Sequence, residues 1–443
     1  MLHDVSVRGC VFISIKIQIQ KNMPSTLTDT VSIRTDRLLE RFLRYVRIDT
    51  AADPQSDSYP SSDKQLTLTK MLARELTAMG IEDVEFTPDG LVIATVPASA
   101  PGDLPVVAAV AHVDTSPEAP SADINPQIID DYRGGDILLL NGGVITVAGY
   151  PKLESMIGET LVTTDGTTLL GGDDKAGVAI IMEVAETLME HPEIPHGPMR
   201  IVMTCDEEIG RGTDKIDVKN LAAAVAYTLD GGGRGQIDVE TFSADAVTVT
   251  FTGHNIHPAI AKNRMINSTR AAARFIDSLP IDDETPETTQ DRDGFIHVHD
   301  VFGGVGQTRV ELILRSFESE MLETYAARVA KLADQAAATI PGMKVHCRVR
   351  RQYRNLADGL ARLPESVALA EQAFVNLNRT CSREIVRGGT DGSQLTEKGL
   401  PTPNLSSGQH NIHSVLEFAN LNEMRDSARH FIELLRLWGG KLS

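Results

Sequence analysis

The sequence predicts an α/β fold: a mostly parallel sheet with helices on both faces, into which a smaller ferredoxin-like α+β domain is inserted. The first observation is a set of short apolar runs without alternation, as expected for strands buried on both faces. The second is an amphipathic helical segment at 175–191, between two of these runs. The third is a change in the order of predicted strands and helices after residue 244. The apolar runs lie at 91–96, 106–111, 200–205 and 225–229.

Helices precede the first of these strands. Segments 35–48 and 64–80 have apolar residues at helical spacing, and the second closes on a glycine, which is typical of a helix C-terminus. Another long helix is predicted near 416–438, where the pattern of apolar strands and helices seen before residue 244 has returned. The larger domain is therefore expected to comprise 34–242 and 353–443.

The inserted domain is predicted to span 243–352. Its segments follow in the order strand, helix, strand, strand, helix, strand, which is the ferredoxin-like arrangement. Its two helices are expected at 265–279 and 319–340. We expect such a domain to act as a lid over a site, as the dimerisation surface of a homodimer, or as both.

The first 33 residues are set apart from the fold. Residues 1–22 contain the apolar segment CVFISIKIQIQ, but a lysine interrupts it and no small-residue cleavage site follows, which argues against a signal peptide. A start at Met23 is the alternative explanation. We expect 1–33 to be an N-terminal extension, either disordered or an artefact of the assigned start site.

Charge and composition exclude several classes of protein. The formal net charge of -19 argues against nucleic acid as a partner, because phosphate binding needs a basic surface. No apolar run reaches the roughly 18 residues of a membrane-spanning helix, so no membrane partner is expected. The four cysteines are far apart and form no CxxC pair, which is typical of reduced thiols in a cytoplasmic protein.

Polar side chains follow three of the predicted strands at the point where each strand ends. The carboxyl ends of parallel strands meet at one edge of an open sheet, which is where α/β proteins place their sites. We therefore expect these side chains to lie together. His112 and Asp114 follow one strand, Glu207 and Glu208 the next, and Asp230 the last.

A fourth acidic pair, Asp173 and Asp174, opens the predicted helix at 175–191. Either aspartate alone could be a helix N-cap, and an isolated histidine such as His112 is more often structural. Several carboxylates and a histidine at one buried edge, however, repel one another unless a cation compensates them. Carboxylate and imidazole ligands without thiolates indicate a catalytic zinc, manganese or cobalt site, and their number suits two ions.

The same residues offer the groups that hydrolysis needs beside a metal. One of two adjacent glutamates, Glu207 and Glu208, can bind metal while the other takes a proton from water. Asp114 is placed to orient His112. The pattern predicts a metal-dependent hydrolase.

Seven segments that carry these residues together resemble the peptidase T family. These are tripeptide aminopeptidases among the dinuclear zinc exopeptidases related to glutamate carboxypeptidase and aminoacylase. The resemblance extends, in order, over about 35–440. The segments are AHVDTSPEA, TTLLGGDDKAG, TCDEEIGRG, AYTLDGGG, GHNIHPAIAK, RGGTDGSQL and GQHNIH.

The resemblance implies two zinc ions and their ligands. His112, Asp173 and Asp230 would hold one ion. Asp173 would bridge to the second ion, which Glu208 and His413 would also hold. Cobalt or manganese could replace zinc in vitro.

The resemblance also implies the reaction. A metal-activated water, deprotonated by Glu207, would attack the first peptide bond of a tripeptide, and the same glutamate would protonate the leaving amine. The N-terminal amino acid and a dipeptide would be released. Asp114 would orient His112, and the peptide bond between Asp173 and Asp174 would be cis. The partners are therefore short peptides, mainly tripeptides.

Three further positions match substrate-binding positions of the family. They are His257 in the inserted domain, Arg315 after the strand RVELIL and Arg387 in RGGTDG. Arginine suits this role because its paired N–H groups fit a carboxylate. The tail departs from the family, since GQHNIHSVLEF stands where relatives commonly have GGYNYHGKHEF. Ser414 and Leu416 thus replace a glycine and a histidine, which bears on substrate preference rather than on the metal ligands.

Two other functions fit parts of the pattern. A zinc dipeptidase or N-acyl amino acid deacylase would share the metal residues but lack the combination of RGGTDG with AYTLDGGG. A noncatalytic metal- or peptide-binding protein would lack the base or a ligand, and the sequence keeps all of them. His410 competes with His413 as a ligand, and the NxH spacing favours His413. The whole motif set favours a tripeptide aminopeptidase.

Overall fold

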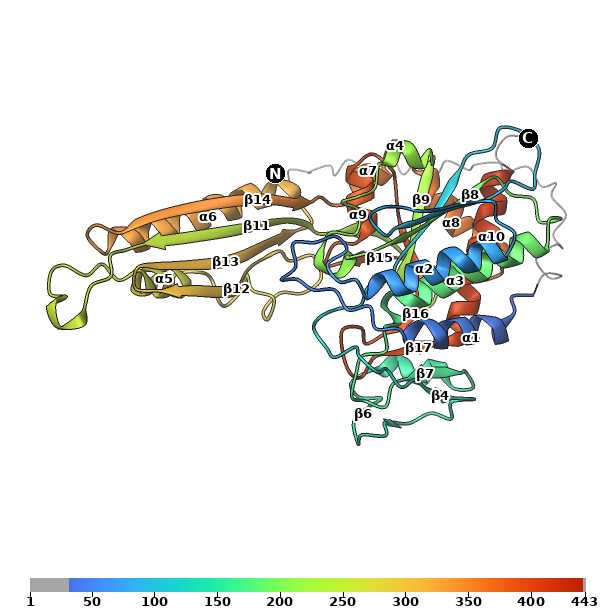
Figure 1. Ribbon diagram of the computed structural model, residues 1–443, viewed down its shortest axis with the longest axis horizontal. Coiled ribbons are helices and arrows are strands. Elements are labelled where there is room, and N and C mark those ends of the chain that lie inside the picture. The colour runs from blue at the N-terminus through green and yellow to red at the C-terminus, as the bar shows by residue number, and fades with distance from the viewer. Residues whose placement is uncertain (1–31, 441–443) are drawn as a thin grey trace, which may run out of the picture. The chain divides into compact units, whose positions relative to one another are not determined.

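A mixed sheet forms the centre of the larger part of the molecule (Figure 1). The computed structural model describes residues 32–440, and from Ile33 onward the chain forms one compact unit. Nine strands follow one another across the sheet, and two more pair beside the sixth. In order they are β1 (Asp83–Phe86), β2 (Val92–Val96), β8 (Met199–Thr204), β3 (Val107–His112), β9 (Val225–Gly232), β16 (Asn404–His410), β17 (Phe418–Asn420), β7 (Leu161–Thr163) and β4 (Gln127–Ile129), with β10 (Gln236–Thr241) and β15 (Ser382–Val386) at the side.

The predicted α/β class is confirmed, and the sheet is parallel at its centre. β8, β3, β9 and β16 run parallel to their neighbours, whereas the strands beyond them on either side pair antiparallel. Burial follows this division: all residues of β3 are buried, while β1 at the edge is largely exposed. Parallel strands need cover on both faces, whereas an edge strand can be added antiparallel with one side in water.

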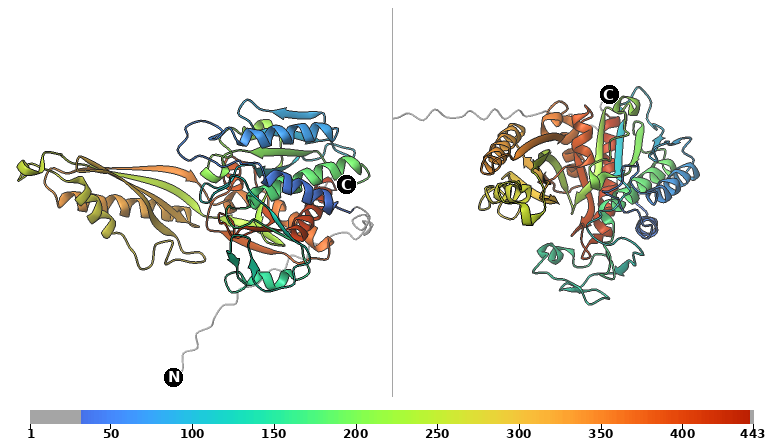
Figure 2. Two further views of the ribbon diagram at one scale, coloured as in Figure 1. Left: turned by 60° about the horizontal axis from the view of Figure 1, so that its bottom comes forward. Right: turned by 60° about the vertical axis from the view of Figure 1, so that its left-hand side comes forward.

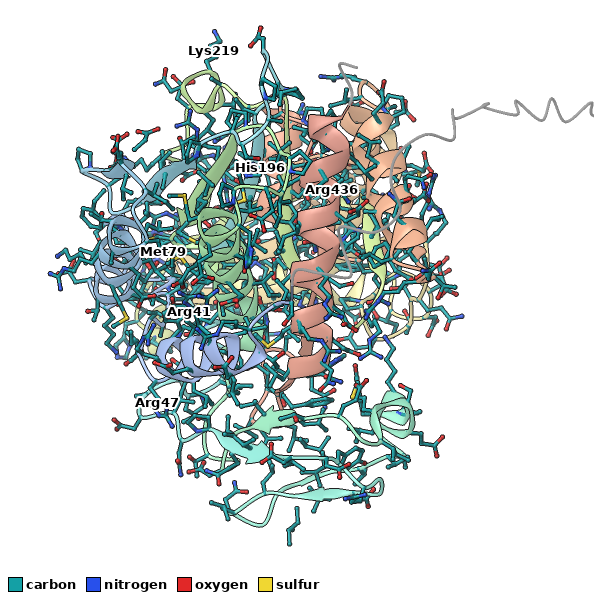
Figure 3. The ribbon with its side chains drawn as sticks, turned by 90° about the vertical axis from the view of Figure 1, so that its right-hand side faces the viewer. Arg41, Arg47, Met79, His196, Lys219 and Arg436 are labelled. Carbon is teal, nitrogen blue, oxygen red and sulfur yellow. The ribbon has the colours of Figure 1, made fainter. Side chains whose placement is uncertain are left out.

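Helices cover both faces of the sheet. On β9, the Tyr227 hydroxyl donates to the carbonyl of Ser366 in α8 (Glu365–Asn376) at 2.8 Å and accepts from the indole of Trp438 in α10 (Leu421–Gly439) at 2.9 Å. The adjacent Ala226 points the other way, into an apolar cluster with Leu395 of α9 (Asp391–Glu397). Figure 3 views the face on which α10 lies beside α3 (Gly172–Glu190).

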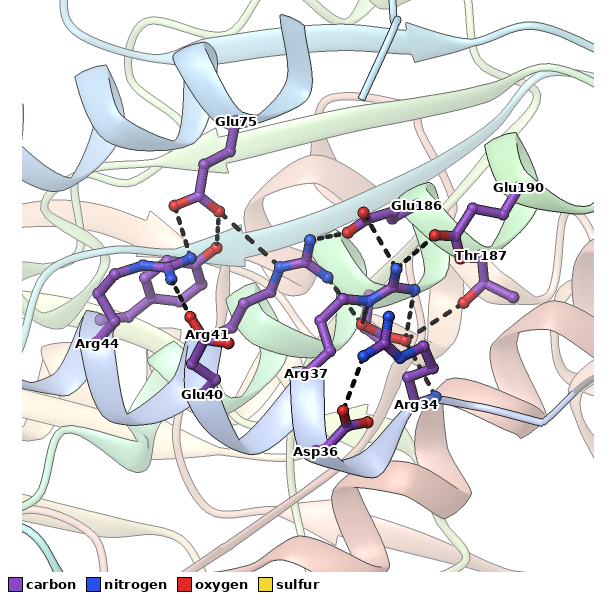
Figure 4. A network of polar contacts seen from close by, with 12 residues as sticks. Arg34, Asp36, Arg37, Glu40, Arg41, Arg44, Glu75, Glu186, Thr187 and Glu190 are labelled. Atoms are coloured by element: carbon purple, nitrogen blue, oxygen red, sulfur yellow. Dashed lines mark hydrogen bonds and ion pairs between the residues drawn. The ribbon is translucent and has the colours of Figure 1, made fainter. Parts of the chain in front are cut away.

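An ion-pair network fixes α1 (Thr35–Val46) and α2 (Gln65–Ala78) to α3 (Figure 4). The guanidinium of Arg37 binds both oxygens of the buried Glu183 carboxylate, at 2.7 and 2.9 Å, and Arg41 donates to the same carboxylate at 2.8 Å. Arg44 and Tyr45 bind Glu75 of α2. Paired arginine–carboxylate bonds of this kind define orientation as well as contact, so the C-terminal half of α3 is held against α1.

The inserted sheet has four antiparallel strands in the order β12-β13-β11-β14, with two helices on one face (Figure 2). Val249 and Phe251 of β11 pack against Phe275 and Val329 of the helices. The ferredoxin-like order is confirmed. Its elements are β11 (Ser243–Thr252), α5 (Ser268–Asp277), β12 (Phe295–Gly304), β13 (Gln307–Ser316), α6 (Ser319–Ala338) and β14 (Lys344–Tyr353).

One detail differs from the sequence-based expectation. The long C-terminal helix begins at Leu421 rather than near 416, because residues 418–420 form β17 and the Asn420 side chain caps the helix. The domain boundaries and the lid or dimerisation role stay predictions, and residues 1–31 of the predicted extension lie outside the described residues. The remaining elements are β5 (Ile137–Leu138), β6 (Val144–Ile145), α4 (Val218–Leu221), α7 (Ala357–Leu360), η1 (Pro151–Met156), η2 (Glu207–Ile209) and η3 (Pro258–Ile260).

Within residues 32–440, every helix is too short or too polar to cross a bilayer.

Candidate metal centre

Seven of the predicted site residues, with Asp114 among them, come together at the carboxyl edge of the parallel strands. His112 is the last residue of β3, and Asp230 lies near the end of β9, which runs further than predicted. Glu207 and Glu208 form a short turn of 3₁₀ helix after β8. Asp173 opens α3, and His413 follows β16. The strand-end positions thus converge as the sheet topology requires.

The first group of contacts surrounds the His112 imidazole. Its Nε2 lies 3.0 Å from Oδ1 of Asp173 and 3.8 Å from Oδ1 of Asp230, and the imidazole is almost completely buried. Its Nδ1 lies 3.0 Å from the main-chain carbonyl of Asp114 and 3.4 Å from Oδ1 of the same residue. Nε2 is therefore the nitrogen that faces the carboxylates.

The second group surrounds the His413 imidazole. Its Nε2 lies 2.9 Å from Oε2 of Glu208 and 3.3 Å from Oδ2 of Asp173. The two oxygens of Asp173 thus face two different histidines, which is the arrangement that a bridging carboxylate needs. Oε1 of Glu208 is buried and has no hydrogen-bond partner within the described part of the chain.

The electrostatics of the site call for a cation. Burial raises the pKa of Asp230 well above its usual range and raises the pKa of Glu208 to about 7. For His413, burial favours the neutral ring, but hydrogen bonds with Asp173 and Glu208 prevail and raise its pKa to about 11. Charged carboxylates in this position are stable only beside a positive partner, and divalent cations supply that charge.

The donor set fits divalent cations. Ligand atoms of His112, Asp173 and Glu208 lie within 4.8 Å of one another, as do those of His112, Asp174 and Asp230. Asp174 has a different task, because its oxygens accept main-chain N–H groups of His112 and Gly177 at 3.3 and 3.2 Å. The peptide bond between Asp173 and Asp174 is cis, as the resemblance implies.

Asp114 connects the two groups of contacts. Its Oδ1 accepts the main-chain N–H of Glu207 and its Oδ2 that of Glu208, each at 3.1 Å. The side chain is fully buried and also faces Nδ1 of His112. One carboxylate therefore positions a histidine and the acidic turn together.

Two other buried carboxylates were not assigned a role from the sequence. Asp206 accepts hydrogen bonds from the main chain and hydroxyl of Ser61 and from the amide of Gln65, at 2.5–2.7 Å. Glu417 accepts the main-chain N–H groups of three residues in the turn before α3, at 2.7–3.0 Å. Those residues are Leu170, Gly171 and Asp173. Asp206 adjoins the predicted base, and Glu417 stands in the tail segment GQHNIHSVLEF. Neither segment indicates hydrogen-bond partners so distant in sequence.

The two histidines of the tail have separate environments. His410 is buried, with Nδ1 2.6 Å from the Tyr150 hydroxyl and Nε2 2.7 Å from Glu423. His413 lies beside Asp173 and Glu208, and its Nδ1 is 3.1 Å from Oε2 of Glu118. The placement agrees with the preference for His413 that the NxH spacing indicated.

The three predicted substrate-binding residues have hydrogen-bond partners other than the metal-site side chains. His257 is exposed on the loop after β11, where its Nδ1 accepts the N–H of Ala259 at 3.2 Å. Arg315 donates to Gln352 at 3.0 Å and lies over the ring of Tyr353. Their roles stay predictions.

Arg387 has three hydrogen-bond partners on the predicted inserted domain. Its guanidinium donates to the main-chain carbonyls of Asp291 and Asp293, at 3.0 and 2.9 Å, and to the hydroxyl of Thr289 at 2.8 Å. It also lies over the ring of Phe242. These bonds join the segment after β15 to the loop before β12, and a substrate role for Arg387 stays a prediction.

Comparison with known proteins identifies the family. The sequence pattern of Peptidase family M20/M25/M40 matches residues 165–437. Peptidase T of Geobacillus kaustophilus is 41% identical over 408 residues, which cover 92% of this chain and 99% of that protein. The chain belongs to the peptidase T family. The family resemblance carried by the seven sequence segments is thereby confirmed.

Solved structures show the same fold. The aminopeptidase PepT from Bacillus cereus superposes with a TM-score of 0.70 at 24% identity, over 92% of this chain and 99% of that one. A dinuclear metal-binding peptidase of the M20 family from Bacillus subtilis gives a TM-score of 0.61 at 17% identity, over 92% and 99%. The arrangement of a large α/β part with a second, smaller sheet is thus a family fold.

Proposed function

We propose that this chain is a metal-dependent tripeptide aminopeptidase that releases the N-terminal residue of short peptides. The observation that carries the proposal is the bridging position of Asp173, whose two oxygens face two different histidines, His112 and His413. The full-length match to peptidase T supports the same activity.

Two divalent cations would be held by five side chains. His112 and Asp230 would hold one, Glu208 and His413 the other, and Asp173 both. We propose zinc, because imidazole and carboxylate ligands without thiolates are typical of its catalytic sites. Bound cations of this kind polarise a carbonyl and make water a stronger nucleophile.

Glu207 is proposed as the general base. It adjoins Glu208, and its main-chain N–H donates a hydrogen bond to Asp114. Its position is therefore fixed relative to the ligands. Burial raises its pKa well above the usual range, which strengthens the carboxylate as a proton acceptor. In the proposed reaction Glu207 takes a proton from the attacking water and gives it to the leaving amine, so that one amino acid and one dipeptide are formed.

The substrate's distal end is proposed to meet the basic residues on and near the inserted domain. His257, Arg315 and Arg387 would contact carbonyl or carboxylate groups, with the domain acting as a lid, a dimer surface or both. We also propose a cytoplasmic location, since Cys205, Cys347 and Cys381 are free thiols.

Peptide length tests the proposal. Purified protein would be incubated with di-, tri- and tetrapeptides with free or blocked N-termini, before and after chelation and with zinc restored. We expect zinc-dependent release of the first residue from free tripeptides. Cleavage of blocked substrates would instead indicate a deacylase, preference for dipeptides a dipeptidase, and zinc binding without hydrolysis a noncatalytic protein.

A further inference from the structure

Gln409 lies directly behind one of the proposed ligands. It stands on β16 opposite Gly232 of β9, and its side chain is buried. The amide Nε2 donates to Oδ1 of Asp230 at 3.0 Å and to the main-chain carbonyl of the same residue at 3.1 Å. Both N–H groups of this amide therefore donate to Asp230.

The orientation of this amide follows from its neighbours. The main-chain carbonyl of Asp230 can only accept hydrogen bonds, so the nitrogen of Gln409 must face it. The reversed amide would bring its oxygen against two acceptor oxygens. The donor is therefore directed at Asp230.

The amide oxygen of Gln409, unlike its nitrogen, has no partner that would explain the residue. Oε1 of Gln409 is buried and has no hydrogen-bond partner within residues 32–440. A buried acceptor without a partner destabilises the fold, and an apolar side chain of similar shape would avoid this. Packing alone thus does not account for a glutamine here, whereas its contact with Asp230 does.

The charge of the group also matters. Burial and the neighbouring Asp173 carboxylate raise the pKa of Asp230, and burial together with Asp230 raises the pKa of Asp174. An amide donates hydrogen bonds without carrying positive charge, so it fixes a carboxylate without competing with a cation for it. A lysine or arginine at this place would neutralise the ligand.

We propose that Gln409 is a positioning residue that fixes the Asp230 carboxylate for the cation shared with His112. The inference rests on the proposed metal-dependent function. Groups that orient ligands in this way change metal affinity by about 10–100-fold when they are removed.

The test is zinc affinity measured without peptide substrate. Apoprotein of the wild type and of Gln409→Met, which keeps the length but removes both donors, would be titrated with zinc in competition with a chromophoric chelator. We expect Gln409→Met to bind one of two zinc ions about 10–100-fold more weakly and the other unchanged. Its melting temperature in excess chelator should be equal to or above that of the wild type, because the unpartnered oxygen is gone.

Two further variants keep the test decisive. Gln409→Glu has nearly the same shape but places an acceptor against Asp230, and we expect at least as large a loss of affinity; it serves also if the methionine variant does not fold. Asn420→Ala is the control, since Asn420 is buried on the adjacent β17 and caps α10. It should lower the melting temperature and leave both zinc affinities unchanged.

The outcomes separate the two proposals. Two unchanged zinc affinities in Gln409→Met and Gln409→Glu, with a lowered melting temperature in chelator, would show a purely structural glutamine and overturn this inference alone. A wild-type protein that binds no zinc and hydrolyses no peptide under any of the metal conditions would overturn the proposed function.

Discussion

The two halves of the candidate metal centre use the same chemical arrangement in different surroundings. In each half a histidine faces the bridging Asp173 with Nε2 and a second carboxylate with Nδ1. In one half the side chains of His112 and Asp114 are 2% and 0% exposed; in the other, those of His413 and Glu118 are 32% and 68% exposed. Because water screens the exposed pair, the same contact between a ring nitrogen and a carboxylate should contribute much less there.

The proposed base provides the largest expected effect and leaves both halves intact. Glu207→Gln should lower kcat by about 10²–10⁴-fold, because the water and the leaving amine lose their proton carrier. Zinc stoichiometry should stay at that of the wild type, measured by elemental analysis of the purified variant. A loss of zinc in parallel with activity would show that Glu207 is a ligand, and the division of the acidic turn into base and ligand would be wrong.

The buried half is tested by Asp114→Asn. One of its two oxygens becomes a donor that opposes the main-chain N–H of Glu207 or Glu208, and the His112 ring loses the negative charge that faces its Nδ1. We expect zinc affinity at one position to fall by about 10–100-fold in a chelator competition titration. Unchanged affinities would indicate that the main-chain carbonyl facing Nδ1 is sufficient to orient His112.

A buried histidine without a carboxylate partner sharpens the contrast with His112. His430 is stacked on Phe374 and faces the carbonyl of Ala370 at 2.8 Å, and burial lowers its pKa to about 4. The unfolded chain, with a pKa near 6.5, takes up this proton first as the pH falls, so the neutral ring's contribution to stability is lost between about pH 6.5 and 4.

The corresponding variant is His430→Gln, which does not titrate but can donate to the same carbonyl. Between pH 7 and 5 the wild type should lose about 2 kcal/mol more unfolding free energy than the variant. Urea unfolding at both pH values measures this difference. Equal losses would mean that His430 takes up a proton as readily in the folded protein as in the unfolded chain.

The exposed half should respond least. Glu118→Gln removes the charge that faces Nδ1 of His413, and we expect zinc affinity to change by no more than about fivefold, the range of exposed ion pairs. The effect should shrink further at high salt, measured by repeating the chelator titration in 1 M NaCl. A change as large as that of Asp114→Asn would contradict the assigned difference between the halves.

Local sequence predicted those parts of the fold that depend on local pattern. Apolar runs located the buried strands, and a polar residue after each run located His112 and Asp230 at the sheet edge. The direction in which β2 pairs with β8, or β17 with β16, is not visible in either strand alone, so the mixed character of the sheet was not predictable. The predicted helix includes the residues of the short strand β17, because Phe418 and Ala419 fit the apolar pattern of a strand as well as that of a helix.

For the site, sequence indicated which residues to consider, and the fold supplied their partners. Asp206 meets Ser61 across 145 positions, and Glu417 meets Asp173 across 244. No spacing rule connects residues so far apart. Gln409 stands in the segment GQHNIH, but that segment does not reveal its partner, which depends on the strand that lies beside β16. The ligand and base roles themselves rest on the family resemblance and await the measurements described above.

The carboxylate of Glu417 has a consequence for what this enzyme can recognise. The turn at residues 170–173 gathers N–H groups in the manner of a backbone nest, a concavity that attracts anions. The protein fills that nest with an anion of its own, covalently attached and almost fully buried. Inorganic phosphate or the C-terminus of a peptide therefore cannot bind these N–H groups, because Glu417 already accepts their hydrogen bonds. The negative end of the substrate must be recognised by other elements.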